Sequence, residues 1–197
     1  MNGKLAGPGR SGSLRGILWG GILCGVFDIT YAFIAFKAPP VAILQSIASG
    51  LLGKRAYEGG LATAALGLFL HFVVAFGAAT VYYLASRKMT FLVRHAVVCG
   101  LLYGMAVYLF MNFVVIPLSA FPRQLSYPPR VLIPGIAWHM VLVGLPIALA
   151  IRWADTRARA SGRPCVRSAT SPVARSRTAA GSARRRDGPP GPRRRPG

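Results

Sequence analysis

The sequence predicts an all-α fold, a four-helix transmembrane bundle with a short interfacial or re-entrant helix after the first span and disordered termini. Two observations predict this fold. Hydrophobic residues make up 53% of the chain and charged residues only 14%, whereas soluble domains carry about 25% charged residues. Residues 59–86 and 95–122 contain no Lys, Arg, Asp or Glu, and each stretch exceeds the roughly 20 residues that cross a bilayer core.

The predicted spans are separated by polar or proline-rich breaks. The first span ends at Lys37-Ala-Pro-Pro40, because proline cannot continue a helical hydrogen-bond ladder. Its apolar run is too long for the core of a signal peptide and contains Asp28, so we interpret it as a retained helix. The spans are expected at about residues 14–36, 61–85, 96–118 and 131–151.

The segment between the first two spans, residues 41–52, is apolar but too short to cross a bilayer. Ile43, Ile47 and Leu51 recur at helical spacing, which favours a helix lying in the interface or re-entering the membrane.

The two ends of the chain are predicted to be disordered. Residues 1–13 are polar and rich in Gly and Ser, residues 14–152 form the transmembrane domain, and residues 153–197 form an Arg-rich tail with little to bury. Because the tail adjoins a membrane span, anionic lipid headgroups are its expected partner and nucleic acid is disfavoured. The alternative is a tail without function.

The orientation follows from the Lys and Arg residues in the short loops. The end of the bundle that holds both termini is the more basic one, chiefly because of the tail. We expect a multi-pass protein of the bacterial inner membrane with both termini in the cytoplasm.

Glycines at four-residue spacing occur in the first and third spans. Such residues let helix backbones approach closely in lipid. We interpret them as packing positions within the chain, and the alternative is a homo-oligomer formed through the same faces. The glycines concerned are Gly16, Gly20, Gly21, Gly25, Gly100 and Gly104.

An internal repeat is also suggested. Gly21-Ile-Leu-Cys-Gly25 matches Gly100-Leu-Leu-Tyr-Gly104, and the string around His71 matches the string around His139, as two copies of a helical hairpin would.

Four polar side chains in different spans form the candidate site. Asp28, His71, Asn112 and His139 fall within about one helical turn of a common depth when each helix is counted from the same side. A carboxylate in a span is costly unless it is paired, hydrated or protonated. We predict that Asp28 lies within side-chain reach of His71 or His139 and that the cluster holds a proton, a cation or a small polar ligand. The alternative for each residue is a structural hydrogen bond.

No enzyme signature appears in the sequence. There is no phosphate-binding Gly-rich loop, no HExxH and no nucleophile elbow. Cys24, Cys99 and Cys165 form no metal-binding or disulfide pattern. We expect no metal site and no cofactor, and a haem held by the two mid-span histidines ranks last.

Several segments resemble a group of small, uncharacterised bacterial multi-pass membrane proteins. They are Asp28-Ile-Thr-Tyr-Ala-Phe33, Leu44-Gln-Ser-Ile-Ala-Ser-Gly-Leu-Leu-Gly53, Leu66-Gly-Leu-Phe-Leu-His-Phe72, Tyr108-Leu-Phe-Met-Asn-Phe113 and residues 139–149. The resemblance covers about residues 14–152 and implies a four-helix membrane protein, but no activity.

Three classes of function remain open from the sequence. The leading hypothesis is a small membrane protein that binds or passes a proton, ion or small polar solute. The second is a non-catalytic structural or assembly subunit that packs through its glycine faces. The third is a haem-binding protein or another membrane enzyme.

Overall fold

The computed structural model describes residues 10–122 and 128–161, and these residues are helical throughout apart from short connections. The elements are α1 (Arg10–Phe36), α2 (Pro40–Leu52), η1 (Gly53–Tyr57), α3 (Gly60–Lys88), α4 (Phe91–Arg94), α5 (Ala96–Phe110), η2 (Met111–Val115), α6 (Ile116–Leu118), α7 (Pro129–His139), η3 (Met140–Gly144) and α8 (Leu145–Ser161). The predicted all-α class is confirmed.

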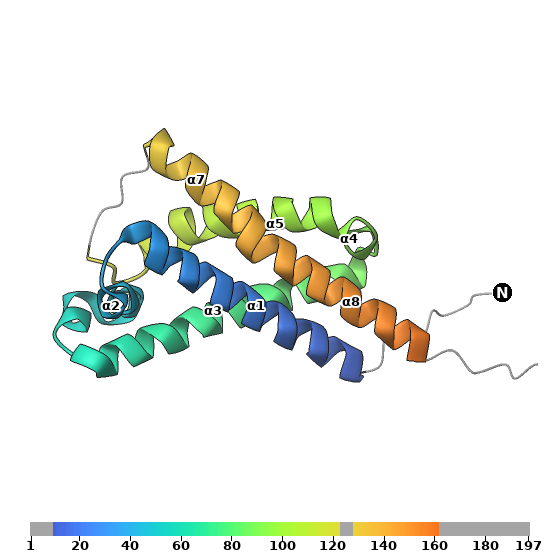
Figure 1. Ribbon diagram of the computed structural model, residues 1–197, viewed down its shortest axis with the longest axis horizontal. Helices are drawn as coiled ribbons and strands as arrows, with labels where there is room; N and C mark the ends of the chain where they lie inside the picture. Colours follow the sequence, from blue (N-terminus) through green and yellow to red (C-terminus); the bar gives the residue numbers. More distant parts are fainter. Residues whose placement is uncertain (1–9, 123–127, 162–197) are drawn as a thin grey trace, which may run out of the picture. The chain divides into compact units, whose positions relative to one another are not determined.

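Four helical segments are long and apolar enough to cross a membrane, so the chain is a multi-pass membrane protein. They are Leu14–Phe36, Gly60–Lys88, Ala96–Leu118 and Pro129–Ala160. The third combines α5, η2 and α6, and the fourth combines α7, η3 and α8, because η2 and η3 are π-helical turns within otherwise continuous helices (Figure 1).

Helix ends differ from the predicted spans where charged residues continue the helix. The first helix begins at Arg10, α3 runs to Lys88, and α8 runs to Ser161. In the last turns of α8, Arg159 Nε donates to Asp155 at 2.8 Å, a pair spaced one turn apart. The remaining predicted disorder, at residues 1–9 and 162–197, lies outside the described residues.

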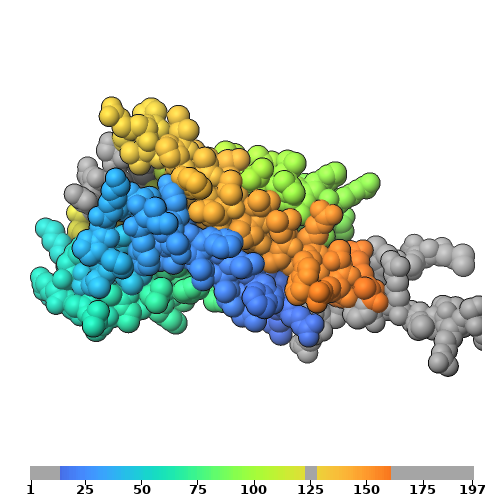
Figure 2. Space-filling model, viewed as in Figure 1, coloured from blue at the N-terminus to red at the C-terminus, as the bar shows by residue number. Residues whose placement is uncertain are grey.

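The first helix packs against two others, with α3 on one side and α8 on the other (Figure 1). A methyl group at Gly16 would lie 3.2 Å from Ala154 of α8, and one at Gly25 would lie 2.6 Å from Phe72 of α3. On the face shown in Figure 2, the side chains of α1 and α8 lie against each other.

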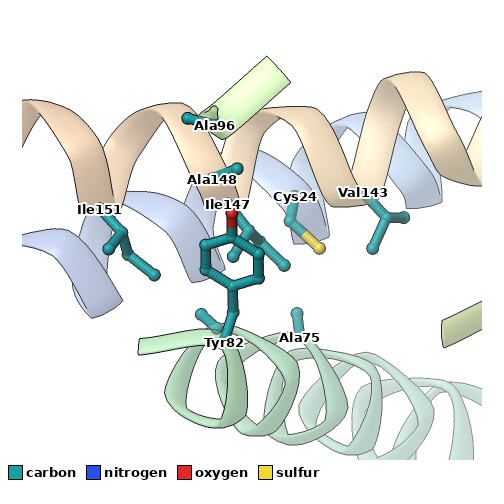
Figure 3. Close-up of a cluster of buried hydrophobic side chains, with 9 residues drawn as sticks. Cys24, Ala75, Tyr82, Ala96, Val143, Ile147, Ala148 and Ile151 are labelled. Carbon is teal, nitrogen blue, oxygen red and sulfur yellow. The ribbon is translucent and has the colours of Figure 1, made fainter. Parts of the chain in front are cut away.

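The core is built from small residues around one large ring (Figure 3). Tyr82 points from α3 towards Ile147 and Ala148 of α8, and its hydroxyl donates to the carbonyl of Leu92 at 3.1 Å. Large apolar side chains stay exposed on the outer faces of all four spans, as lipid contact requires. The buried core contains Cys24, Ala75, Ala79, Tyr82, Ala96, Val143, Ile147, Ala148 and Ile151.

The short helix α2 packs on the first half of α3, at the end of the bundle where α1 ends. Gly67 lets α3 approach the carbonyl of Leu44 closely. Buried Gln45 donates to the carbonyl of Gly60 at 3.0 Å, and the Ala120 amide donates to the carbonyl of Gly50 at 2.9 Å. These bonds tie α2 to the start of α3 and to the segment that follows α6.

All six glycines predicted to mediate packing face another helix of the same chain. The two hairpins use them in the same register. A methyl group at Gly25 would meet the Phe72 ring, next to His71, and one at Gly104 would meet the backbone of His139 and Met140. This matched register supports the predicted repeat.

Candidate functional site

The structure brings Asp28 and His139 together, as the depth argument predicted. Asp28 lies on α1, His139 is the last residue of α7, and His139 Nε2 lies 3.7 Å from Asp28 Oδ1. Their side chains are 27% and 23% exposed in the absence of lipid. The pair therefore joins the first and fourth spans in the middle of both helices.

The other ring nitrogen of His139 fixes the hydrogen-bonding role of the imidazole. His139 Nδ1 lies 2.9 Å from the backbone carbonyl oxygen of Gly135, one turn earlier in α7. A carbonyl oxygen only accepts hydrogen bonds, so Nδ1 must carry the hydrogen and donate. In a neutral ring, Nε2 is then an acceptor with its lone pair towards Asp28.

Two acceptors therefore face each other when Asp28 is ionised and His139 is neutral. Neither a carboxylate nor an unprotonated ring nitrogen can donate. One additional proton removes the conflict, whether it sits on Nε2 or on the carboxyl group. A cation between the two atoms, or a water molecule donating to both, would act in the same way. The arrangement thus suits a ligand that donates to the two acceptors or carries positive charge between them.

Tyr108 supports His139 from the third span. The Tyr108 side chain is buried, and its ring meets the His139 ring edge to face at 4.8 Å. Gly135 makes room for Tyr108, because a methyl group at Gly135 would lie 2.6 Å from Tyr108 Cζ. The sequence interpretation missed Tyr108, although its position four residues before Asn112 places both on one helix face.

Asn112 lies in the π-helical turn η2, close to this support. Its Nδ2 donates to the Tyr108 carbonyl at 2.9 Å. This bond places the Asn112 amide one turn along the helix from Tyr108, the residue whose ring contacts His139.

His71 contacts α1 one turn away from Asp28. Its Nε2 donates to the carbonyl oxygen of Gly25 at 2.9 Å, and its ring packs edge-on against Phe72. For His71 the structure therefore favours the alternative of a structural hydrogen bond over direct pairing with the Asp28 carboxylate. His139, and not His71, is the partner of Asp28.

Two aromatic rings from the same helices flank the pair. Tyr31 of α1 and Trp138 of α7 lie with ring centroids 4.8 Å apart. Each is close in sequence to a member of the pair, so their contact helps to hold α1 and α7 at the distance at which Asp28 and His139 meet. Sequence spacing alone does not reveal a contact between two different spans.

Both π-helical turns occur at this level of the bundle. The turn η3 begins directly after His139, and η2 contains Asn112. Single π-helical turns inside α-helices are frequent at functional sites, because they change the direction of the side chains that follow. Gly104 faces the backbone at His139, and Gly144 faces the backbone at Gly100 and Gly104, so the two spans touch closely here.

Within residues 10–122 and 128–161, no group of three or more His, Cys, Asp or Glu side chains is placed to hold a metal ion. Comparison of the chain with known proteins finds no matching family model, no matching curated protein and no matching solved structure. The resemblance to small bacterial membrane proteins stays a prediction.

Proposed function

We propose that this chain is a bacterial inner-membrane protein that passes protons across the bilayer, with the Asp28–His139 pair taking up and releasing the proton. One observation supports this proposal. Two acceptor atoms, His139 Nε2 and Asp28 Oδ1, face each other at 3.7 Å inside the membrane-spanning region. In neutral His139 the single N–H hydrogen is on Nδ1, which donates it to the Gly135 carbonyl, so Nε2 carries none. A proton bound to either atom turns that atom into a donor facing the other.

The glycine faces weigh against the assembly-subunit alternative. Gly16 and Gly20 contact α8, Gly21 and Gly25 contact α3, and Gly100 and Gly104 contact the fourth span. These faces are used inside the chain, so a homo-oligomer or larger assembly would need a different surface.

In the proposed orientation both termini lie in the cytoplasm. At the end of the bundle where α1 begins and α8 ends, the described basic residues are Arg10, Arg15, Arg87, Lys88, Arg94, Arg152, Arg157 and Arg159, and at the other end they are Lys37, Lys54, Arg55 and Arg130. This difference supports a cytoplasmic position of the first end. The Arg-rich tail would then face the anionic lipids of the inner leaflet.

Proton passage can be tested in liposomes that contain purified full-length protein and a pH-sensitive dye in the lumen. An imposed pH gradient, with potassium and valinomycin to prevent a membrane potential, should collapse faster than in protein-free liposomes. Asp28→Asn should remove the acceleration, since an amide cannot take up the proton. Glu58→Gln is the matched control, because Glu58 is an exposed acid outside the spans. Equal rates for wild type and Asp28→Asn would contradict the proposal.

A further inference from the structure

A pocket lies at the end of the bundle that holds the termini, far along the spans from Asp28. It is bounded by the start of α1, the end of α3, the turn around α4 and the end of α8. Its lining residues are Gly16, Tyr83, Ser86, Arg87, Thr90, Val93, Ile151, Ala154, Asp155 and Arg159.

The charges around the pocket leave one guanidinium uncompensated. Asp155 is largely buried and pairs with Arg159 at 2.8 Å. Arg87 has no ion-pair partner among the residues that the structure describes. The pocket therefore carries a net positive charge with one arginine free to bind an anion, and a guanidinium offers several donors in a geometry that suits phosphate.

The remaining lining divides into a polar and an apolar part. Ser86 and Thr90 bring hydroxyl groups close to Arg87 in sequence, whereas Gly16, Ile151 and Ala154 are apolar. A ligand that fits both parts has a charged headgroup joined to a hydrocarbon chain.

The level of the pocket agrees with such a ligand. Trp153 and Arg157 lie on the same turns of α8, with the Arg157 guanidinium 4.5 Å from the Trp153 ring centroid. Tryptophan and arginine at the end of a span are typical of the headgroup region, where one side of the ring is apolar and the other wet.

We propose that this pocket binds the phosphate of an anionic phospholipid, with Arg87 contacting the phosphate and the apolar wall contacting the start of the acyl chains. The site belongs to the folded bundle. It is independent of the Arg-rich tail and of proton passage through Asp28.

The test compares two neighbouring basic residues in the full-length protein. Both side chains are exposed, but Arg87 lines the pocket and Lys88 does not. Arg87→Gln and Lys88→Gln remove the same charge and leave the tail unchanged. Binding of phosphatidylglycerol to detergent-solubilised protein is measured by native mass spectrometry and by the rise in Tm, with phosphatidylcholine as reference.

We expect Arg87→Gln to weaken phosphatidylglycerol binding about tenfold or more, as the loss of a charged hydrogen bond implies. Lys88→Gln should bind like wild type, and Arg87→Lys should restore part of the affinity. An unchanged Tm of Arg87→Gln in phosphatidylcholine shows that the variant folds. Equal loss in Arg87→Gln and Lys88→Gln would overturn the proposal, as would competition by inorganic phosphate at concentrations equal to the lipid, which would identify a free phosphate as the ligand.

Discussion

Asp28 Oδ1 and His139 Nε2 approach to 3.7 Å across the contact between the first and fourth spans, and the hydrogen bond from His139 Nδ1 to Gly135 leaves both of these atoms as acceptors. The contribution of each side chain to the free energy of unfolding should therefore depend on the presence of the other. Isolated polar groups in lipid are costly, and a shared proton or ligand lowers that cost for both members.

We expect Asp28→Ala and His139→Ala to be non-additive. Residues in contact typically couple by about 0.5–3 kcal/mol in a double-mutant cycle. The cycle of Asp28→Ala with His71→Ala should give a smaller coupling, because His71 bonds to the Gly25 carbonyl. Unfolding of the purified protein in mixed detergent measures all four free energies. A coupling with His71 larger than that with His139 would show that the pairing is assigned to the wrong histidine.

The close contact of the third and fourth spans predicts a difference between two glycines. Gly104→Ala places a methyl group against the His139 carbonyl and Met140, and we expect it to lower the unfolding free energy by about 1–3 kcal/mol. Gly77→Ala is the control, since nothing lies within 4 Å of its added methyl group. The control should be neutral or stabilising by up to about 1 kcal/mol. Thermal unfolding in detergent compares the two, and a Gly104→Ala protein as stable as wild type would argue against this packing.

The topology can be tested with reporter fusions at Thr90 and Leu125. Thr90 follows α3, and position 125 lies between the third and fourth spans. With both termini in the cytoplasm, a reporter at Thr90 should be active in the cytoplasm and one at Leu125 outside it. An external signal at Thr90 would reverse the orientation and would place the Arg87 pocket in the outer leaflet.

Removal of residues 162–197 should leave insertion and stability unchanged. Their composition of Arg, Pro, Gly, Ser and Ala offers little apolar surface to bury. The cut is made after Ser161 because α8 continues to that residue. Membrane fractionation and thermal unfolding compare the truncated and full-length proteins, and a truncated protein that fails to accumulate in the membrane at a normal transcript level would contradict the expectation.

The sequence was sufficient to predict the spans, because long uncharged stretches have few alternatives to a membrane helix. It placed helix ends less well. Hydropathy marks the segment that lies in hydrocarbon, whereas a helix continues through charged residues such as Arg87 and Arg159 as long as its backbone bonds are made. Counting along each helix was also sufficient to place Asp28 and His139 at one level.

The surroundings of the pair were not predictable in the same way. The contact of Tyr108 with His139 and that of Tyr31 with Trp138 depend on how different spans rotate about their axes. The π-helical turns η2 and η3 shift that rotation by part of a turn, and neither of them was predicted from the sequence. His71 shows the same limit, because depth alone did not indicate which of the two histidines faces the carboxylate.

The most direct test is the protonation state of the two ring nitrogens of His139, measured by nitrogen-15 NMR on histidine-labelled protein in lipid. The chain has three histidines, so a His139→Gln sample identifies the signals. A proton held between Asp28 and His139 predicts that Nδ1 is protonated in every state and that the Nε2 signal shifts in Asp28→Asn, where the amide donates to Nε2. A neutral ring with its hydrogen on Nε2 and a bare Nδ1 would contradict the proposal, because that ring would donate to Asp28 without any additional proton.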